Sequence, residues 1–179
     1  MNYLTLENIS KSYGDKILFE NLNLTIAKGQ KIALIAKNGS GKTTLLQLIA
    51  GETGVEGENA RILAAKGITI GYLRQDPHFN PTDNVLEAAL DSSNKEIQAI
   101  KELELATIFG NQKKIQVAIE LVDDLKAWDI EARIKEVLGK LKIHDLKQNV
   151  TSLSGGQQKR LALAKLLIDE PEFLILDDP

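Results

Sequence analysis

The chain has 179 residues, a size that fits one domain with a sizeable core. It has no cysteine, which excludes disulfides, thiolate metal sites and a cysteine nucleophile, and its net charge of −3 predicts no global attraction to nucleic acid or anionic membranes. No apolar run approaches the roughly 20 residues of a membrane-spanning helix, and the N-terminus does not resemble a signal peptide. A soluble, cytoplasmic protein without membrane insertion is the simplest expectation.

The N-terminal part of the chain is predicted to form strands. Apolar residues alternate roughly over 4–9 and cleanly over 22–26, and Gly14 with Asp15 marks a turn between these segments. Residues 32–36 form a continuous apolar run, which is typical of a strand buried on both faces.

Helices dominate the rest of the pattern. Apolar spacing predicts a helix over 43–50, with Gly51 at its C-terminal end. Short strands follow near 59–64 and 68–73. The pattern is helical between 84 and 141 and is broken near Gly110 and Asn111, so 94–109 and 112–127 are predicted to form an antiparallel hairpin. A further helix is predicted over 156–168, and a second buried strand over 173–176.

A glycine-rich loop joins the predicted strand 32–36 to the predicted helix 43–50. The usual phosphate loop reads Gly-x-x-x-x-Gly-Lys-Ser/Thr, and residues 36–43 read Ala-Lys-Asn-Gly-Ser-Gly-Lys-Thr. The glycines let backbone N–H groups point at phosphate oxygens, and the helix adds the positive end of its dipole. Lys42 would reach the β- and γ-phosphates, and the Thr43 hydroxyl would take a Mg²⁺ position. Ala36 departs from the pattern and is tolerable if its φ is negative, so nucleotide binding is favoured over a plain turn.

A second motif consists of four apolar residues followed by Asp177 and Asp178. An acid at the end of a strand can hold the Mg²⁺ water shell, and the next carboxylate can orient or deprotonate an attacking water. Alone, this pattern fits a solvated strand end. Paired with the phosphate loop, it predicts a metal-holding role for Asp177 and a catalytic role for Asp178.

The third motif reads Leu-Ser-Gly-Gly-Gln over 153–157. With the other two motifs, it makes the whole chain resemble an ATP-binding cassette (ABC) ATPase. The resemblance implies an α/β fold: a P-loop NTPase cassette with a RecA-like parallel sheet core, an N-terminal antiparallel β subdomain, and a helical subdomain with a helical-hairpin arm. In that family the signature glycines bind the γ-phosphate held by an opposite cassette, so ATP is sandwiched between two cassettes.

The resemblance also implies a set of site residues. Tyr13 takes the place of the aromatic that stacks on adenine, and Gln75 that of the glutamine that senses Mg²⁺ and the γ-phosphate; outside the family they would fit a strand aromatic and a surface loop residue. The catalytic positions are Lys42, Gln75 and Asp178, and the Mg²⁺ positions are Thr43, Gln75 and Asp177. The ATP-binding positions are Tyr13, Asn38, Gly39, Ser40, Gly41, Lys42, Thr43, Thr44, Ser154, Gly155, Gly156 and Gln157.

Within the superfamily, the chain most resembles the ABC-F branch, which has no membrane domain and includes ribosome-associated translation factors. The resemblance rests on the runs Trp-Asp-Ile-Glu-Ala-Arg-Ile (128–134) and Gln-Gln-Lys-Arg-Leu-Ala-Leu-Ala (157–164), and on the length of 78–152. It implies an arm, about 94–127, that reaches toward ribosomal RNA and tRNA. Lysines and acids are balanced in the arm, so charge alone does not predict RNA binding, and its apolar residues fit a hairpin seam.

By the same resemblance the chain is one C-terminally incomplete cassette, truncated after the Walker B motif. Residues 1–77 would form the β subdomain and phosphate-loop core, 78–152 the helical subdomain, and 153–179 the signature helix and Walker B strand. The family places a further strand between those ending at 36 and 176, so we expect the isolated piece to be poorly stable and weak or inactive in hydrolysis. Asp178 stands where the family has glutamate, and its shorter side chain predicts slower hydrolysis with binding preserved.

Three functions remain open. The first is an ABC-F ATPase that works with a second cassette, in the same longer chain or a dimer mate, and couples ATP to a ribosomal partner. The second is the ATPase subunit of a membrane transporter, and the third is a regulatory module that holds ATP with little turnover. His78 and His144 have no metal-ligand companions and are predicted to be surface residues.

Overall fold

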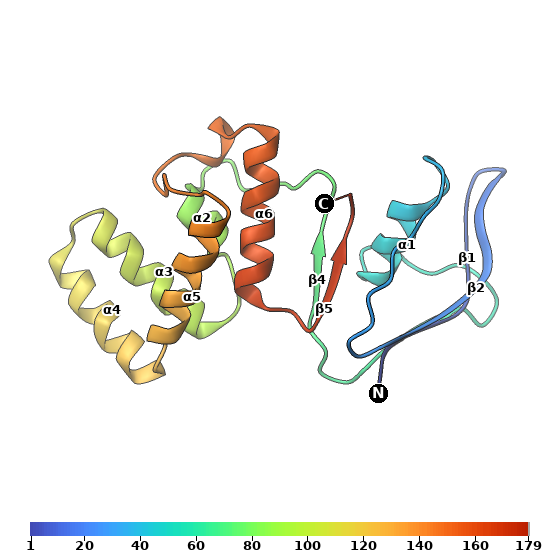
Figure 1. Ribbon diagram of the computed structural model, residues 1–179, viewed down its shortest axis with the longest axis horizontal. Coiled ribbons are helices and arrows are strands. Elements are labelled where there is room, and N and C mark those ends of the chain that lie inside the picture. Colours follow the sequence, from blue (N-terminus) through green and yellow to red (C-terminus); the bar gives the residue numbers. More distant parts are fainter. Residues whose placement is uncertain (179) are drawn as a thin grey trace. The chain divides into compact units, whose positions relative to one another are not determined.

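A computed structural model describes residues 1–178, which divide into two units (Figure 1). The strand unit combines residues 1–72 with 171–177, and the helical unit comprises residues 73–170 together with Asp178. Each unit has a hydrophobic core of its own.

The N-terminal sheet of the strand unit is antiparallel, with strand order β2-β1-β3. Strands β1 (Asn2–Tyr13) and β2 (Lys16–Ala27) form a hairpin around the predicted turn, where Gly14 adopts a φ of 55°. Strand β3 (Arg61–Ala64) pairs with the other edge of β1. Because side chains alternate between the faces of a strand, Leu4 and Leu6 of β1 are both buried in the same core.

Helix α1 (Lys42–Ile49) belongs to the same core and begins directly after the glycine-rich loop. Leu45, Leu48 and Ile49 are buried, which follows the helical spacing of the sequence. Gly51 lies just beyond the helix with a φ of 78°, the left-handed conformation expected after a helix end.

The second sheet pairs β4 (Ile70–Leu73) with β5 (Phe173–Leu176), and the two strands run in the same direction (Figure 1). The amide of Phe173 donates to the carbonyl of Thr69 at 3.0 Å. The prediction that β5 is buried on both faces was wrong: Ile175 is buried, but Leu174 and Leu176 are 45% and 42% exposed. One face of β5 therefore packs on the core of the strand unit and the other does not.

The segment 32–36 does not form the predicted buried strand. It has no regular secondary structure, and the exposed fractions of Ile32 and Ile35 are 47% and 94%. A strand exists only where a neighbour completes its ladder of hydrogen bonds, and none of the strands described over residues 1–178 pairs with this segment. An apolar run indicates that a segment tends to be buried, but it does not specify the strand with which the segment would pair.

The helical unit contains five α-helices and a short 3₁₀ helix over its described residues. They are α2 (Val85–Ala89), α3 (Lys95–Ile108), α4 (Gln112–Leu125), α5 (Trp128–Lys140), the 3₁₀ helix η1 (Val150–Ser152) and α6 (Gly155–Asp169). None of the helices described over residues 1–178 is long and apolar enough to cross a membrane.

Helices α3 and α4 form a hairpin around Gly110, which has a φ of 66° (Figure 1). The predicted seam is confirmed: Ile97, Ile100, Leu103 and Val122 are buried, and Ile115 and Ile119 pack against them. We call this hairpin the arm.

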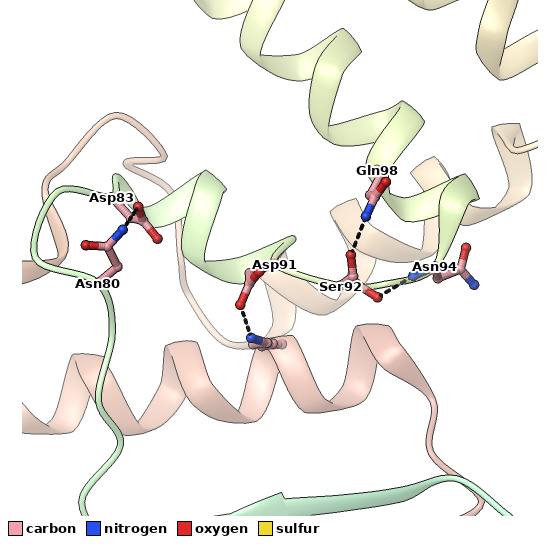
Figure 2. Close-up of polar contacts among 7 residues, drawn as sticks. Asn80, Asp83, Asp91, Ser92, Asn94 and Gln98 are labelled. Atoms are coloured by element: carbon pink, nitrogen blue, oxygen red, sulfur yellow. Dashed lines mark hydrogen bonds and ion pairs between the residues drawn. The ribbon is translucent and has the colours of Figure 1, made fainter.

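The root of the arm is fixed by polar contacts (Figure 2). Asn94 caps α3 by accepting from the amides of Glu96 and Ile97, and the side chain of Gln98 donates to the carbonyl of Ser92 at 2.8 Å. Just before them, Asp91 forms an ion pair with Lys165 of α6. The start of the arm is therefore tied to the helix that carries the signature motif.

Arg133 of α5 holds the other end of the same helix. Its guanidinium donates to the carbonyl of Ile168 at 2.8 Å and forms an ion pair with Glu170. Glu170 is the C-cap of α6 and adopts a left-handed φ of 47°, which is uncommon outside glycine, asparagine and aspartate. The ion pair therefore links α5 to the residue at which the chain leaves α6.

Candidate functional site

The glycine-rich loop curls through two left-handed glycines. Gly39 has a φ of 74° and Gly41 a φ of 95°. Gly41 is also tightly packed, because a Cβ built on it would lie 3.0 Å from Cβ of Leu18. The backbone conformation thus favours glycine at position 41, and a larger residue there would also crowd Leu18 of strand β2.

Ala36 fits the loop because it is not among the described residues with positive φ. Its carbonyl accepts a hydrogen bond from Nζ of Lys42 at 2.8 Å, and the carbonyl of Lys37 lies 3.3 Å from the same atom. The Lys42 ammonium therefore donates hydrogen bonds to backbone carbonyls of its own loop. Within residues 1–178, Oγ of Ser40 is buried and has no hydrogen-bond partner. A buried hydroxyl without a partner is uncommon, and in a loop of this type a phosphate oxygen is a partner that it could bind.

Lys16 is a second cation at this loop, and no sequence motif singles it out. Its Nζ donates to the carbonyl of Gly39 at 2.9 Å. Lys16 lies at the start of β2, so only the path of the hairpin brings it to the loop.

Asp177 joins the second motif to the first. Oγ1 of Thr43 donates to Oδ1 of Asp177 at 3.2 Å, across 134 positions of the sequence. Asp177 is only 4% exposed, and it is the only buried charged residue of the described chain. A second hydroxyl, that of Tyr72 in β4, donates to Oδ2 of the same carboxylate at 3.2 Å.

Sequence reasoning missed Tyr72, although the residue stands in the same segment as Gln75. The available signal was alternation in β4: Gly71 and Leu73 are buried, so Tyr72 faces the other way. The contact between Tyr72 and Asp177 depends on how β4 pairs with β5. The sequence of either strand alone does not specify that pairing.

The residues at this point fit a magnesium ion. No group of three or more His, Cys, Asp or Glu side chains that could hold a metal occurs over the described residues. Mg²⁺, however, is commonly held by one or two oxygen ligands of the protein together with substrate phosphates. The Thr43 hydroxyl and the Asp177 carboxylate supply that oxygen set beside the glycine-rich loop.

The ring of Tyr13 is 56% exposed and lies outside the core of the strand unit, which argues against a packing role. Nζ of Lys11 stands 5.7 Å from the centre of the ring. The same lysine is paired with Glu56, and its hydrogen bond, together with one from the amide of Ser12, lowers the pKa of the Glu56 carboxyl. Tyr13 is therefore an exposed aromatic residue with a lysine ammonium over one face of its ring.

The signature residues begin α6. Ser154 and Gln157 form a capping box, in which each side chain bonds the backbone amide of the other residue. A Cβ built on Gly155 or Gly156 would meet nothing within 4 Å. Packing within this chain therefore does not require either glycine, and their small size leaves the start of the helix open to a ligand.

The remaining predicted residues are spread over both units. Asn38 is exposed in the loop and Thr44 is half-buried in α1. Gln75 is exposed in a bend after β4, and Asp178 is exposed with a left-handed φ of 45°. The strand unit thus brings together the loop, Thr43 and Asp177, whereas Gln75, Asp178 and the signature belong to the helical unit. His78 and His144 lie outside the buried core.

Comparisons with known proteins agree on the class of this site. A family model described as "ABC transporter" matches residues 19–179. The chain is 37% identical to the uncharacterized ABC transporter ATP-binding protein YfmR of Bacillus subtilis, covering 100% of this chain and 29% of that protein. It is 29% identical to the energy-dependent translational throttle protein EttA of Mycobacterium tuberculosis, covering 98% of this chain and 32% of that protein.

The fold has solved counterparts as well. A structure described as the ATP binding subunit of an ABC transporter superposes with a TM-score of 0.69 at 20% identity, covering 99% of this chain and 66% of that one. This likeness confirms the expected α/β cassette fold, with its antiparallel N-terminal sheet and parallel core. The chain spans about a third of the length of YfmR and of EttA.

Proposed function

This chain belongs to the ABC transporter family, and on that premise we propose that it binds MgATP and, with a second cassette, hydrolyses it to ADP and phosphate. The observation that carries the proposal is the hydrogen bond between Thr43 and the buried Asp177, beside a loop with two left-handed glycines. Two motifs far apart in the sequence thereby supply a phosphate cradle and oxygen ligands at one place.

The proposed roles follow from the contacts of each group. The loop amides, the Ser40 hydroxyl and the Lys42 ammonium would bind the phosphates, and Lys42 would leave its carbonyl partners to do so. Thr43 and Asp177 would hold Mg²⁺, which when bound neutralises the charge that develops on the phosphate oxygens. Gln75 and Asp178 are proposed to orient the attacking water.

The exposed surfaces of Tyr13 and of the signature residues are the proposed binding sites for the adenine and for the second cassette. The exposed ring of Tyr13 supports stacking on a base. The uncrowded Gly155 and Gly156 support binding of the γ-phosphate of an opposite cassette, since the amides at the start of α6 attract anions. We further propose the organisation expected from the sequence: 1–77 as β subdomain and loop core, 78–152 as helical subdomain, and 153–179 as signature helix and Walker B strand.

The partner is proposed to be the ribosome, which would place the protein in the cytoplasm. Support comes from the name of EttA, a translational throttle protein, and from the long hairpin arm. The transporter alternative is supported by the family description and by the likeness to the ATP binding subunit of an ABC transporter. The regulatory alternative rests on Asp178, whose carboxylate is one methylene shorter than that of glutamate.

Equilibrium binding of a fluorescent ATP analogue tests the core of the proposal. Lys42→Ala should weaken MgATP binding by at least about tenfold, because it removes the charge-assisted contact to the phosphates. Lys28→Ala, an exposed lysine of the same unit, serves as the matched control. Equal affinity in the Lys42 variant and the parent would contradict the site.

Co-sedimentation with ribosomes tests the partner. In the presence of a non-hydrolysable ATP analogue the protein should pellet with ribosomes. The charge reversals Lys113→Glu and Lys114→Glu, near the turn of the arm, should release it, whereas Lys147→Glu should not. Failure to pellet under every nucleotide condition, with co-purification of a membrane protein, would favour the transporter alternative.

A further inference from the structure

The Asp177 carboxylate is held by a hydroxyl on each of its oxygens. Thr43 donates to Oδ1 and Tyr72 to Oδ2, both at 3.2 Å. The Thr43 contact is part of the proposed metal site. The Tyr72 contact comes from a different element, the strand β4 that neighbours β5, and the proposed function gives it no role.

The hydrogen bond from Tyr72 restricts a rotation of the Asp177 carboxylate that the hydrogen bond from Thr43 alone permits. The terminal torsion of an aspartate is broad, so a carboxylate held at one oxygen can still rotate about its last bond. Hydroxyls on opposite oxygens fix that rotation. Asp177 is also 4% exposed, so Oδ2 would have little water to replace a lost partner.

We propose that Tyr72 is a positioning residue for the magnesium ion: its hydroxyl holds Oδ2 of Asp177 and thereby fixes the carboxylate beside the Thr43 hydroxyl. The inference rests on the proposed MgATP binding and adds a residue to that same site. Tyr72 does not touch the nucleotide in this proposal, so its effect should appear in the metal dependence of binding and not in metal-free binding.

The test measures ATP affinity in EDTA and as a function of Mg²⁺ concentration. Tyr72→Phe removes only the hydroxyl, and Tyr3→Phe removes a hydroxyl from β1 of the same unit without touching Asp177. In Tyr72→Phe the affinity in EDTA should match the parent, while the half-saturating Mg²⁺ concentration should rise about 10- to 150-fold, which corresponds to the loss of one hydrogen bond to a charged group. Tyr3→Phe should match the parent in both measurements.

Tyr72→Leu separates positioning from packing, because it removes the ring as well as the hydroxyl. If the Phe variant has the parent's Mg²⁺ dependence and only the Leu variant is impaired, the ring is structural and the inference is overturned. The same holds if Tyr72→Phe weakens binding equally in EDTA and in Mg²⁺. Binding of Mn²⁺ in the presence of ATP, followed by its paramagnetic signal, gives a second readout that should weaken in parallel. A parent that binds no ATP at any Mg²⁺ concentration would overturn the proposed function itself, and the role of Tyr72 with it.

Discussion

Substituting alanine for Gly41 should weaken ATP binding more than the same substitution at Gly39. The two glycines stand two positions apart in the loop, and both have left-handed backbones, with φ of 95° and 74°. They differ in their surroundings. A Cβ at position 41 would lie 3.0 Å and 3.2 Å from two carbons of Leu18, whereas a Cβ at position 39 would lie 3.8 Å from Nζ of Lys16, which is ordinary van der Waals contact.

The magnitudes follow from these two terms. A left-handed conformation costs an L-residue about 1–2 kcal/mol, so Gly39→Ala should reduce affinity by about 5- to 30-fold if the loop must adopt this shape to bind. Gly41→Ala carries the same strain plus an overpacking term of about 1–3 kcal/mol against Leu18. The sum is about 2–5 kcal/mol, a loss of at least about 30-fold.

Titration of a fluorescent ATP analogue into the variants measures both losses. Leu18→Gly provides the decisive control, because it removes both Cβ and Cδ1 of Leu18; in the double variant with Gly41→Ala the clash is gone and the backbone strain remains. The double variant, compared with Leu18→Gly alone, should lose only as much affinity as Gly39→Ala does. Binding of ATP by Gly41→Ala as tight as in the parent, or no recovery on adding Leu18→Gly, would contradict the crowding at position 41.

Three further predictions concern stability and solubility. Ile100→Ala, at a fully buried position of the arm, should destabilise the helical unit by about 2–5 kcal/mol in urea unfolding. Asp91→Asn should lower stability at pH 7 by less than about 1 kcal/mol, because the pair with Lys165 is largely exposed. The hydrogen bond from Lys165 lowers the pKa of Asp91 in the folded state, so this contribution is present above the ordinary pKa of aspartate, about 3.9, and is lost as the pH falls through the lower folded value. Ile35→Lys should raise the concentration at which the protein aggregates, measured by light scattering, because it interrupts an exposed apolar run.

Each of these predictions has a matched comparison. Val117→Ala, at an exposed position of α4, should change stability far less than Ile100→Ala, and equal effects would contradict the packing of the arm. A stability difference between Asp91→Asn and the parent that grows below pH 4 would contradict the sign derived for the pair. Unchanged aggregation of Ile35→Lys, with a gain from Val117→Lys instead, would show that exposure in 32–36 is not the cause.

Local signals in the sequence predicted the loop and its helix. The motif of residues 36–43 predicted the curled loop that contains Gly39 and Gly41, the position of Gly51 predicted the helix end, and the apolar spacing of α1 predicted its buried face. The seam of the arm was predictable for the same reason, since a helix repeats within a few residues.

Features that depend on a distant partner were not predictable. The apolar run 32–36 looked like a buried strand, but a ladder needs a neighbour that its own residues do not specify. Two contacts depend on how separate elements of the fold are placed against each other: that of Tyr72 with Asp177 and that of Lys16 with Gly39. The second motif, paired with the glycine-rich loop, predicted that Asp177 serves the same site as Thr43, whereas no motif pointed to Tyr72.

The interleaving of the two units has a consequence for the order in which the nascent chain can assemble. Every residue from 73 to 170 is available once residue 170 has left the ribosome, so the helical unit can form from one continuous stretch. The core of the strand unit is incomplete without β5, because Ile175 of β5 packs in the same core as Leu4, Leu6 and the buried residues of α1. The glycine-rich loop is thus synthesised well before its partner, because Thr43 precedes Asp177 by 134 positions. A pause or premature stop before β5 would leave the helical unit formed while the strand unit still lacks the strand that leads to Asp177.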